Sequence, residues 1–260
     1  MKAARKKELL EYLVAALAAE RDAELPGSMD VDELWTMFRG FVNTRPPGPA
    51  DAGLLAAQDE LLKGVIAEAG VHGLDDATVS PVDGRLRLWR GDITTLDVDA
   101  IVNAANSQML GCWVPGHHCI DNAIHTYSGV QLRIECARLM DEQGHEEPAG
   151  QAKITPAYNL PARHVIHTVG PIANGRPTDA HRALLASCYR SCLDAAADAG
   201  LRSIAFCCIS TGLFGFPKAE AARIAVSTVR AWLDDRASDM VVVFNVFGHE
   251  DEKIYRDVLW

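Results

Sequence analysis

The sequence has no apolar run long enough to cross a membrane and no excess of basic residues. A membrane-spanning helix needs about 18 or more apolar residues in succession, and no stretch of the 260 residues reaches that length. Lysine and arginine number 25 against 35 aspartates and glutamates, which gives a net charge of −10. Binding to a nucleic-acid backbone needs clustered basic side chains. We therefore expect neither a membrane protein nor a nucleic-acid-binding protein.

We also expect no secretory signal at the N-terminus. The basic start, Met1 to Lys7, resembles that of a signal peptide, but the apolar stretch after it contains four acidic residues at helical spacing, Glu8, Glu11, Glu20 and Asp22. The apolar core of a signal peptide does not tolerate such charges, so we expect a cytoplasmic protein. In that compartment cysteines are mostly small buried apolar residues, and five of the seven lie in apolar segments. Cys112 and Cys119 are the exceptions, because they lie in a loop.

The first 80 residues carry helical patterns alone. Apolar residues at three- and four-residue spacing predict helices over 9–18, 31–42 and 50–69. Asp30 is expected to cap the second helix, and Gly70 to end the third. No grouping typical of a catalytic site occurs here. We predict a helical N-terminal extension, 1–80, packed on a main domain, 81–260.

From residue 84 onwards, strand and helix patterns alternate. Strands are predicted over 85–90, 100–103, 164–168, 203–209 and 240–247, with 153–158 as a further candidate. The intervening segments have helical patterns, at 120–143, 180–199, 218–235 and 250–260. This alternation is typical of a mostly parallel sheet covered by helices on both faces. We therefore expect a three-layer α/β/α fold.

Two loops after predicted strands carry residues suited to a nucleotide, because ligands of such sheets bind at the carboxyl ends of the strands. The loop 210–217 reads STGLFGFP, and its glycines let backbone N–H groups approach an anion. Its spacing is neither that of a P-loop nor that of a dinucleotide fingerprint. A plain turn from strand to helix is the alternative.

The other loop follows the strand 100–102 and contains Asn103 and Asn106. Their carboxamides suit sugar hydroxyls, since each both donates and accepts hydrogen bonds; alternatively, they bond to their own backbone in a turn. Upstream, Asp92 is placed either to accept a hydrogen bond from an exocyclic amine or to cap a helical turn.

Taken in order, these segments resemble the macrodomain family, the ADP-ribose-binding fold. The matching segments are GDIT (91–94), VDAIVNAANS (98–107), HVIHTVGP (164–171), ISTGLFGFP (209–217) and VVFNVF (242–247). The resemblance implies that Asp92 and the Ile93 backbone hold the adenine and that Phe247 stacks on it. It implies that Asn106, supported by Asn103, binds the distal ribose. The diphosphate would be wrapped by Ser210, Thr211, Gly212, Leu213, Phe214, Gly215 and Phe216.

The loop after NAAN departs from the common hydrolytic macrodomains, which have a short run of glycines and then a catalytic aspartate. Here residues 109–122 read MLGCWVPGHHCIDN. This loop is similar to that of a zinc-dependent subgroup found in microbes beside an unusual class of sirtuin, which also carries a helical N-terminal extension. The resemblance makes Asp121 the counterpart of the catalytic aspartate. Judged by position alone, Asp121 could merely complement a helix dipole.

The residue types of this loop suit zinc independently of the resemblance. Cys112, His117 and Cys119 form a C-x4-H-x-C pattern, and zinc prefers thiolate and imidazole ligands. Three protein ligands and an open position are the catalytic arrangement, whereas a structural site has four. His118 or His125 could complete a structural site, and two cysteines together by chance, with no metal, are a further alternative. The subgroup resemblance favours His117 over His118.

We therefore expect a zinc-dependent ADP-ribosylhydrolase that removes mono-ADP-ribose from modified proteins, with Zn²⁺ as cofactor and an Asp or Glu ester as the bond cleaved. The link of the subgroup to a sirtuin suggests a lipoyl-carrier protein as the modified partner. One alternative is a reader that binds ADP-ribosylated proteins without cleaving them, although a reader has no need of a metal loop. Another is an enzyme that acts on O-acetyl-ADP-ribose.

Overall fold

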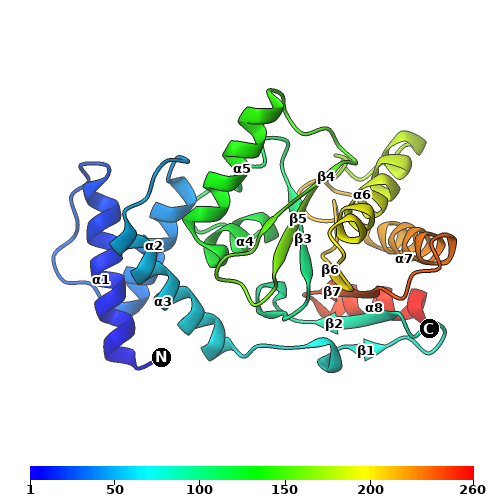
Figure 1. Ribbon diagram of the computed structural model, residues 1–260, viewed down its shortest axis with the longest axis horizontal. Coiled ribbons are helices and arrows are strands. Elements are labelled where there is room, and N and C mark those ends of the chain that lie inside the picture. The colour runs from blue at the N-terminus through cyan, green and yellow to red at the C-terminus, as the bar shows by residue number, and fades with distance from the viewer.

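The computed structural model describes residues 1–260, and its centre is one seven-stranded sheet (Figure 1). The strands follow the order β1-β2-β7-β6-β3-β5-β4. Their bounds are β1 Thr78–Val79, β2 Leu86–Arg90, β3 Ala100–Ala105, β4 Ala152–Pro156, β5 His164–Val169, β6 Ser203–Phe206 and β7 Val241–Val246. The inner pairs are parallel, whereas β1 and β4 run antiparallel to their neighbours at the two edges. The expected mostly parallel sheet is confirmed.

Helices cover both faces of the sheet. The helices of the whole chain are α1 Ala3–Ala19, α2 Val31–Thr44, α3 Ala52–Ala69, α4 Ile120–Ser128, α5 Val130–Gln143, α6 Asp179–Asp198, α7 Lys218–Asp235 and α8 His249–Leu259, with two 3-10 turns, η1 Leu74–Asp76 and η2 Ile93–Thr95. Helices α6, α7 and α8 pack side by side on one face, and α4 and α5 cover the other (Figure 1). This is the expected three-layer α/β/α fold. None of the helices combines the length and apolarity needed to cross a bilayer.

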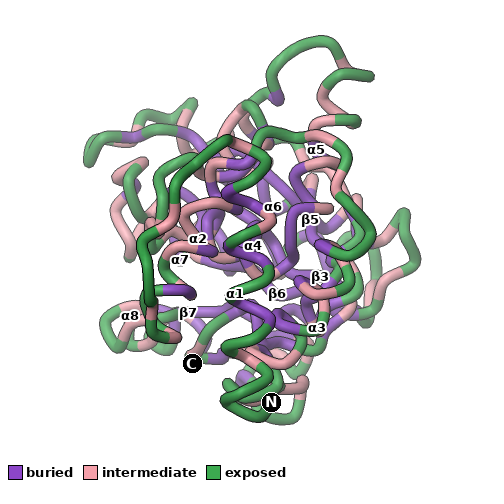
Figure 2. Tube along the Cα trace, turned by 90° about the vertical axis from the view of Figure 1, so that its left-hand side faces the viewer, coloured by how far each residue is buried: buried purple, intermediate pink, exposed green.

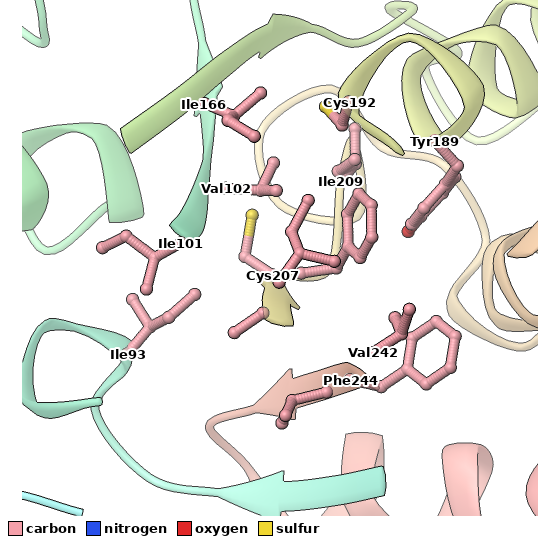
Figure 3. Packing of buried hydrophobic residues seen from close by; sticks show 14 of the residues in the cluster. Ile93, Ile101, Val102, Ile166, Tyr189, Cys192, Cys207, Ile209, Val242 and Phe244 are labelled. Atoms are coloured by element: carbon pink, nitrogen blue, oxygen red, sulfur yellow. The ribbon is translucent and has the colours of Figure 1, made fainter. Parts of the chain in front are cut away.

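The buried side chains form two cores. The larger lies between the sheet and its helices, where Val102 of β3 lies beside Ile166 of the neighbouring β5, and Val242 lies beside Phe244 on β7 (Figure 3). The smaller belongs to the N-terminal helices and is formed by residues of α1, α2 and α3, joined by Val130 of α5. Buried segments run through the middle of the molecule, and exposed ones surround them (Figure 2). Helices α1, α2 and α3 thus have apolar contacts of their own beside the sheet domain.

The prediction of one helix over 120–143 was wrong, because the chain breaks at Gly129 between α4 and α5. Gly129 has φ of 99°, and a Cβ there would lie 2.6 Å from side-chain atoms of Gln58 and Gln131. The strand expected over 203–209 ends early, at Phe206, whereas the strand expected over 100–103 continues to Ala105. The expected N-cap of α2 is confirmed, since the Asp30 carboxylate accepts hydrogen bonds from two backbone N–H groups of the first turn.

Candidate active site

A cleft of about 800 Å³ opens where β3, β6 and β7 end. Most of the residues that the sequence marks as a site line it, namely Asp92, Ile93, Asn106, Cys112, His117, Cys119, Asp121, Ser210, Thr211, Gly212, Leu213, Phe214 and Phe247. Three marked residues do not line it. Asn103 is fully buried within β3, and the Phe216 side chain lies in the core. Gly215 faces away from the cleft, towards the backbone of Asn174.

One wall of the cleft carries an exposed aromatic ring beside a carboxylate. Phe247 follows β7 and has 79% of its surface exposed, although it is large and apolar. Asp92 follows β2, and its Oδ1 accepts hydrogen bonds from the Thr94 N–H at 3.0 Å and the Thr94 hydroxyl at 2.7 Å. Its other carboxylate oxygen accepts none from the protein. This wall therefore offers a stacking surface and a free acceptor, as an aminated planar ring requires.

The loop after β6 presents its main chain to the cleft. The loop closes on itself, because the Phe216 N–H donates to the Ser210 carbonyl at 2.9 Å. The N–H groups of Gly212, Leu213 and Phe214 donate to no protein acceptor. A Cβ at Gly170 would collide with the side chains of Ser210 and Ile209, so the glycine leaves room for this loop. Unused N–H groups on one tight loop are suited to holding an anion.

Asp121 lies in the first turn of α4 with its carboxylate almost completely buried. Asn103 Nδ2 donates to its Oδ1 at 2.8 Å, and Asn106 Nδ2 donates to its Oδ2 at 3.3 Å. Burial raises the pKa of Asp121 to about 6, partly opposed by these two hydrogen bonds. A carboxylate with a pKa near the operating pH is suited to proton transfer. The two asparagines expected at a ribose therefore also hold the expected catalytic carboxylate.

The orientation of Asn103 is fixed by a histidine that the sequence did not mark. His167 of β5 is the register partner of Asn103, and its Nδ1 lies 3.1 Å from Asn103 Nδ2. Burial lowers the pKa of His167 to about 3, so the ring is neutral. Its Nδ1 accepts from Asn103, and its Nε2 donates to the Thr155 hydroxyl at 3.0 Å. One amide nitrogen of Asn103 thus serves both His167 and Asp121, which turns the Asn103 carbonyl away from the carboxylate.

The loop between β3 and α4, here called the metal loop (residues 110–119), brings three donor atoms together. The Cys112 and Cys119 sulfurs and a His117 ring nitrogen lie within 4.8 Å of one another. Cys112 Sγ and His117 Nδ1 are 3.5 Å apart. Sulfur and nitrogen bound tetrahedrally to one zinc ion would be roughly 3.5 Å apart, given the usual bond lengths. The residues present therefore fit the ion.

Two further histidines stand apart from this group. His118 is exposed and does not join the three donors. His125 belongs to a separate, fully buried group with Cys136 and His167. The three donors are therefore without a fourth protein ligand from either residue. Burial and the neighbouring Cys112 raise the pKa of Cys119 to about 11, so a nearby cation would be needed for both thiols to ionise.

Comparison with known proteins identifies the family of the chain. A protein of Treponema medium named protein-ADP-ribose hydrolase is 52% identical over 255 residues, which cover 96% of each chain. A Staphylococcus aureus protein of the same name is 46% identical over 257 residues, which cover 96% of this chain and 95% of the relative. The family model described as Macro domain matches residues 102–225. The chain belongs to the macrodomain family.

The macrodomain fold is equally clear in the comparison of structures. The Trypanosoma brucei macrodomain, solved in complex with ADP-ribose, is similar with a TM-score of 0.67 and 32% identity, over 84% of this chain and 95% of that one. The expected family, the expected fold and the expected enzyme class, a hydrolase, are confirmed.

Proposed function

We propose that this macrodomain is a zinc-dependent ADP-ribosylhydrolase that removes mono-ADP-ribose from aspartate or glutamate side chains of modified proteins. One observation carries the proposal: a single cleft contains a stacking wall, a loop of free N–H groups, and a buried carboxylate beside three zinc-type donors. The names of the relatives agree with the general reaction. The zinc ion and the ester linkage are part of our proposal and go beyond those names.

The order of the strands supports the way ADP-ribose would lie. In the sheet, β7 and β6 separate β2 from β3. Since neighbouring strands are about 4.8 Å apart, β2 and β3 are separated by roughly 14 Å. Asp92 and Phe247 would hold the adenine at the β2 and β7 ends. The loop after β6 would then meet the diphosphate, and Asn106 after β3 would meet the distal ribose.

In this arrangement Asp121 takes up a proton. Its carboxylate, held by Asn103 and Asn106, would orient a water molecule at the distal ribose and accept its proton as the bond to the modified residue breaks. The products are ADP-ribose and a free carboxylate. A carboxylate leaves without being protonated, so a site with one proton-accepting group is sufficient. This is our reason for favouring an Asp or Glu ester.

Cys112, His117 and Cys119 would hold the zinc ion at the side of the cleft that Asp121 occupies. When bound there, zinc supplies Lewis acidity towards an oxygen of water or substrate. The chain itself supplies the backbone around the ion and binds the ligand at points away from the bond that breaks. Together these contacts hold the reacting atoms in a fixed relative position. The modified partner would be a cytoplasmic protein, and a lipoyl-carrier protein is the candidate that we propose.

The test measures release of ADP-ribose from peptides carrying it on glutamate, serine or arginine, with and without a chelator. We expect release from the glutamate-linked peptide, and we expect the chelator to abolish it. Binding of all peptides with no release would instead identify a reader. Release from O-acetyl-ADP-ribose alone would identify a metabolite esterase, and full release in the presence of chelator would remove zinc from the reaction.

A further inference from the structure

The metal loop has very little structure of its own. Between residues 110 and 119 one backbone hydrogen bond is internal, from the His117 N–H to the Val114 carbonyl at 3.2 Å. Gly111 and Gly116 both have positive φ, 78° and 64°. A loop with so few internal bonds does not hold three side chains in a fixed geometry unless its neighbours hold it. Much of that support comes from α2 of the N-terminal extension.

Asn43 of α2 holds the middle of the metal loop. Its side chain is 1% exposed, and its Oδ1 accepts a hydrogen bond from the Gly116 N–H at 2.9 Å. Its Nδ2 donates to the Thr126 hydroxyl of α4 at 2.9 Å. One carboxamide therefore fixes the residue next to His117 relative to the helix that carries Asp121.

Arg39, one turn earlier on α2, holds the end of the metal loop. Its Nη2 donates to the His117 carbonyl at 3.3 Å and to Asn122 Oδ1 at 3.0 Å. Asn122 in turn donates from its side chain to the Val114 carbonyl and from its backbone N–H to Cys119 Sγ. Arg39 thus contacts one donor residue directly and orients the residue that contacts another.

The start of the metal loop is tied to the end of α2 through Arg133 of α5. Its Nε donates to the Leu110 carbonyl at 2.6 Å, and its Nη1 donates to the carbonyls of Val42 and Arg45. The guanidinium also lies 4.2 Å from the centre of the Trp113 ring. The beginning, middle and end of the metal loop are therefore all connected to α2.

We propose that the N-terminal extension is part of the active site, and that Arg39 and Asn43 are positioning residues that set the geometry of the three zinc donors. Docking of the extension on the sheet domain has polar contacts of its own elsewhere, through Gln58 and Asp59 of α3. Docking therefore does not by itself require the contacts that Arg39 and Asn43 make with the metal loop. The inference rests on the proposed function, since it concerns the same donors.

The experiment uses the full chain and compares Asn43→Ala and Arg39→Met with Asp59→Ala. Asp59 accepts hydrogen bonds from Gln131 and Asn159 and so docks α3 without contacting the metal loop. Zinc affinity is measured by competition with a chromophoric chelator, and the melting temperature is measured on metal-free protein. Loss of residues that support metal ligands weakens metal binding about 10- to 100-fold. We expect that loss for Asn43→Ala and Arg39→Met, and less than about 2-fold for Asp59→Ala.

If the alanine variant folds poorly, a conservative variant at the same position provides the test. In Asn43→Asp the acceptor for the Gly116 N–H remains, so zinc affinity should stay closer to that of the parent than in Asn43→Ala. A parent protein that binds no zinc would refute the proposed function, and this inference would fall with it. A parent that binds zinc, with variants at Asn43 and Arg39 that bind it equally well, would refute this inference alone. An equal loss in Asp59→Ala would reduce the effect to docking and refute it too.

Discussion

Phe247 offers a clean test of ligand placement, because the protein has no structural need for its ring. The side chain is 79% exposed at the rim of the cleft. Removing a side chain that is exposed to this degree usually changes the free energy of unfolding by less than about 0.5 kcal/mol. Any larger effect of Phe247→Ala on function must then come from the ligand.

The expected magnitude follows from stacking. A base stacked on an aromatic side chain contributes about 1–3 kcal/mol, which corresponds to roughly 5- to 150-fold in affinity. Phe247→Ala should therefore weaken ADP-ribose binding by a factor in that range in titration calorimetry. Because the adenine is remote from the bond that breaks, KM should rise while kcat stays nearly constant.

The control is Trp260→Ala, which removes another exposed aromatic ring, at 43% exposure and outside the cleft. It should leave the affinity unchanged. Phe247→Ala with the parent's affinity and melting temperature would show that no adenine stacks there. The assignment of the β2 and β7 ends to the adenine would then be refuted, and with it the direction in which we lay the ligand across the sheet.

Three further predictions concern the chemistry and the buried groups. Asp121→Asn should lower kcat by about 10²- to 10⁴-fold, which is the usual contribution of a general base. Its affinity for ADP-ribose, measured by calorimetry, should stay within a few-fold of the parent. A smaller loss of kcat would exclude the base role. Cys112→Ala should remove zinc, measured by elemental analysis, and abolish turnover while leaving most ADP-ribose binding; undiminished turnover without metal would refute the zinc role. His125 and His167 are buried with lowered pKa values, so below about pH 6.5 the unfolded chain binds protons that the folded chain does not. As the pH decreases below that value, the free energy of unfolding therefore decreases by about 1.4 kcal/mol per pH unit for each histidine. In urea unfolding between pH 6.5 and 4, His167→Gln should halve that part of the slope.

The sequence was a good guide where the relevant interactions are local. Apolar runs, and polar–apolar alternation at 85–90, placed the strands. The spacing of Cys112, His117 and Cys119 indicated a group of donors on one short loop, which the structure does bring together. Similarly, a capping side chain such as Asp30 acts within one turn of its own helix. Such features depend on neighbours a few residues away, so one sequence contains their cause.

The features that the sequence did not predict depend on contacts across the fold. At Gly129, where the helix breaks, Gln58 of α3 lies against the glycine and accepts a hydrogen bond from the Val130 N–H. His167 meets Asn103 because of the register between β5 and β3, which no local pattern specifies. Asn43 reaches the metal loop 73 residues later because α2 packs beside α4. These contacts decide how the site is held, and they became visible with the tertiary structure.

Under the proposed function, the loop after β6 offers the diphosphate its main chain and not its side chains. The exposed Leu213 side chain can therefore vary without removing the anion contacts, and such variation would change what the entrance of the cleft admits. The anion contacts depend instead on the residues that shape the backbone. Gly170 and Gly215 are of this kind, since a methyl group at either would collide with or crowd a neighbouring segment. Affinity for ADP-ribose and choice of the attached protein can thus change separately in this macrodomain.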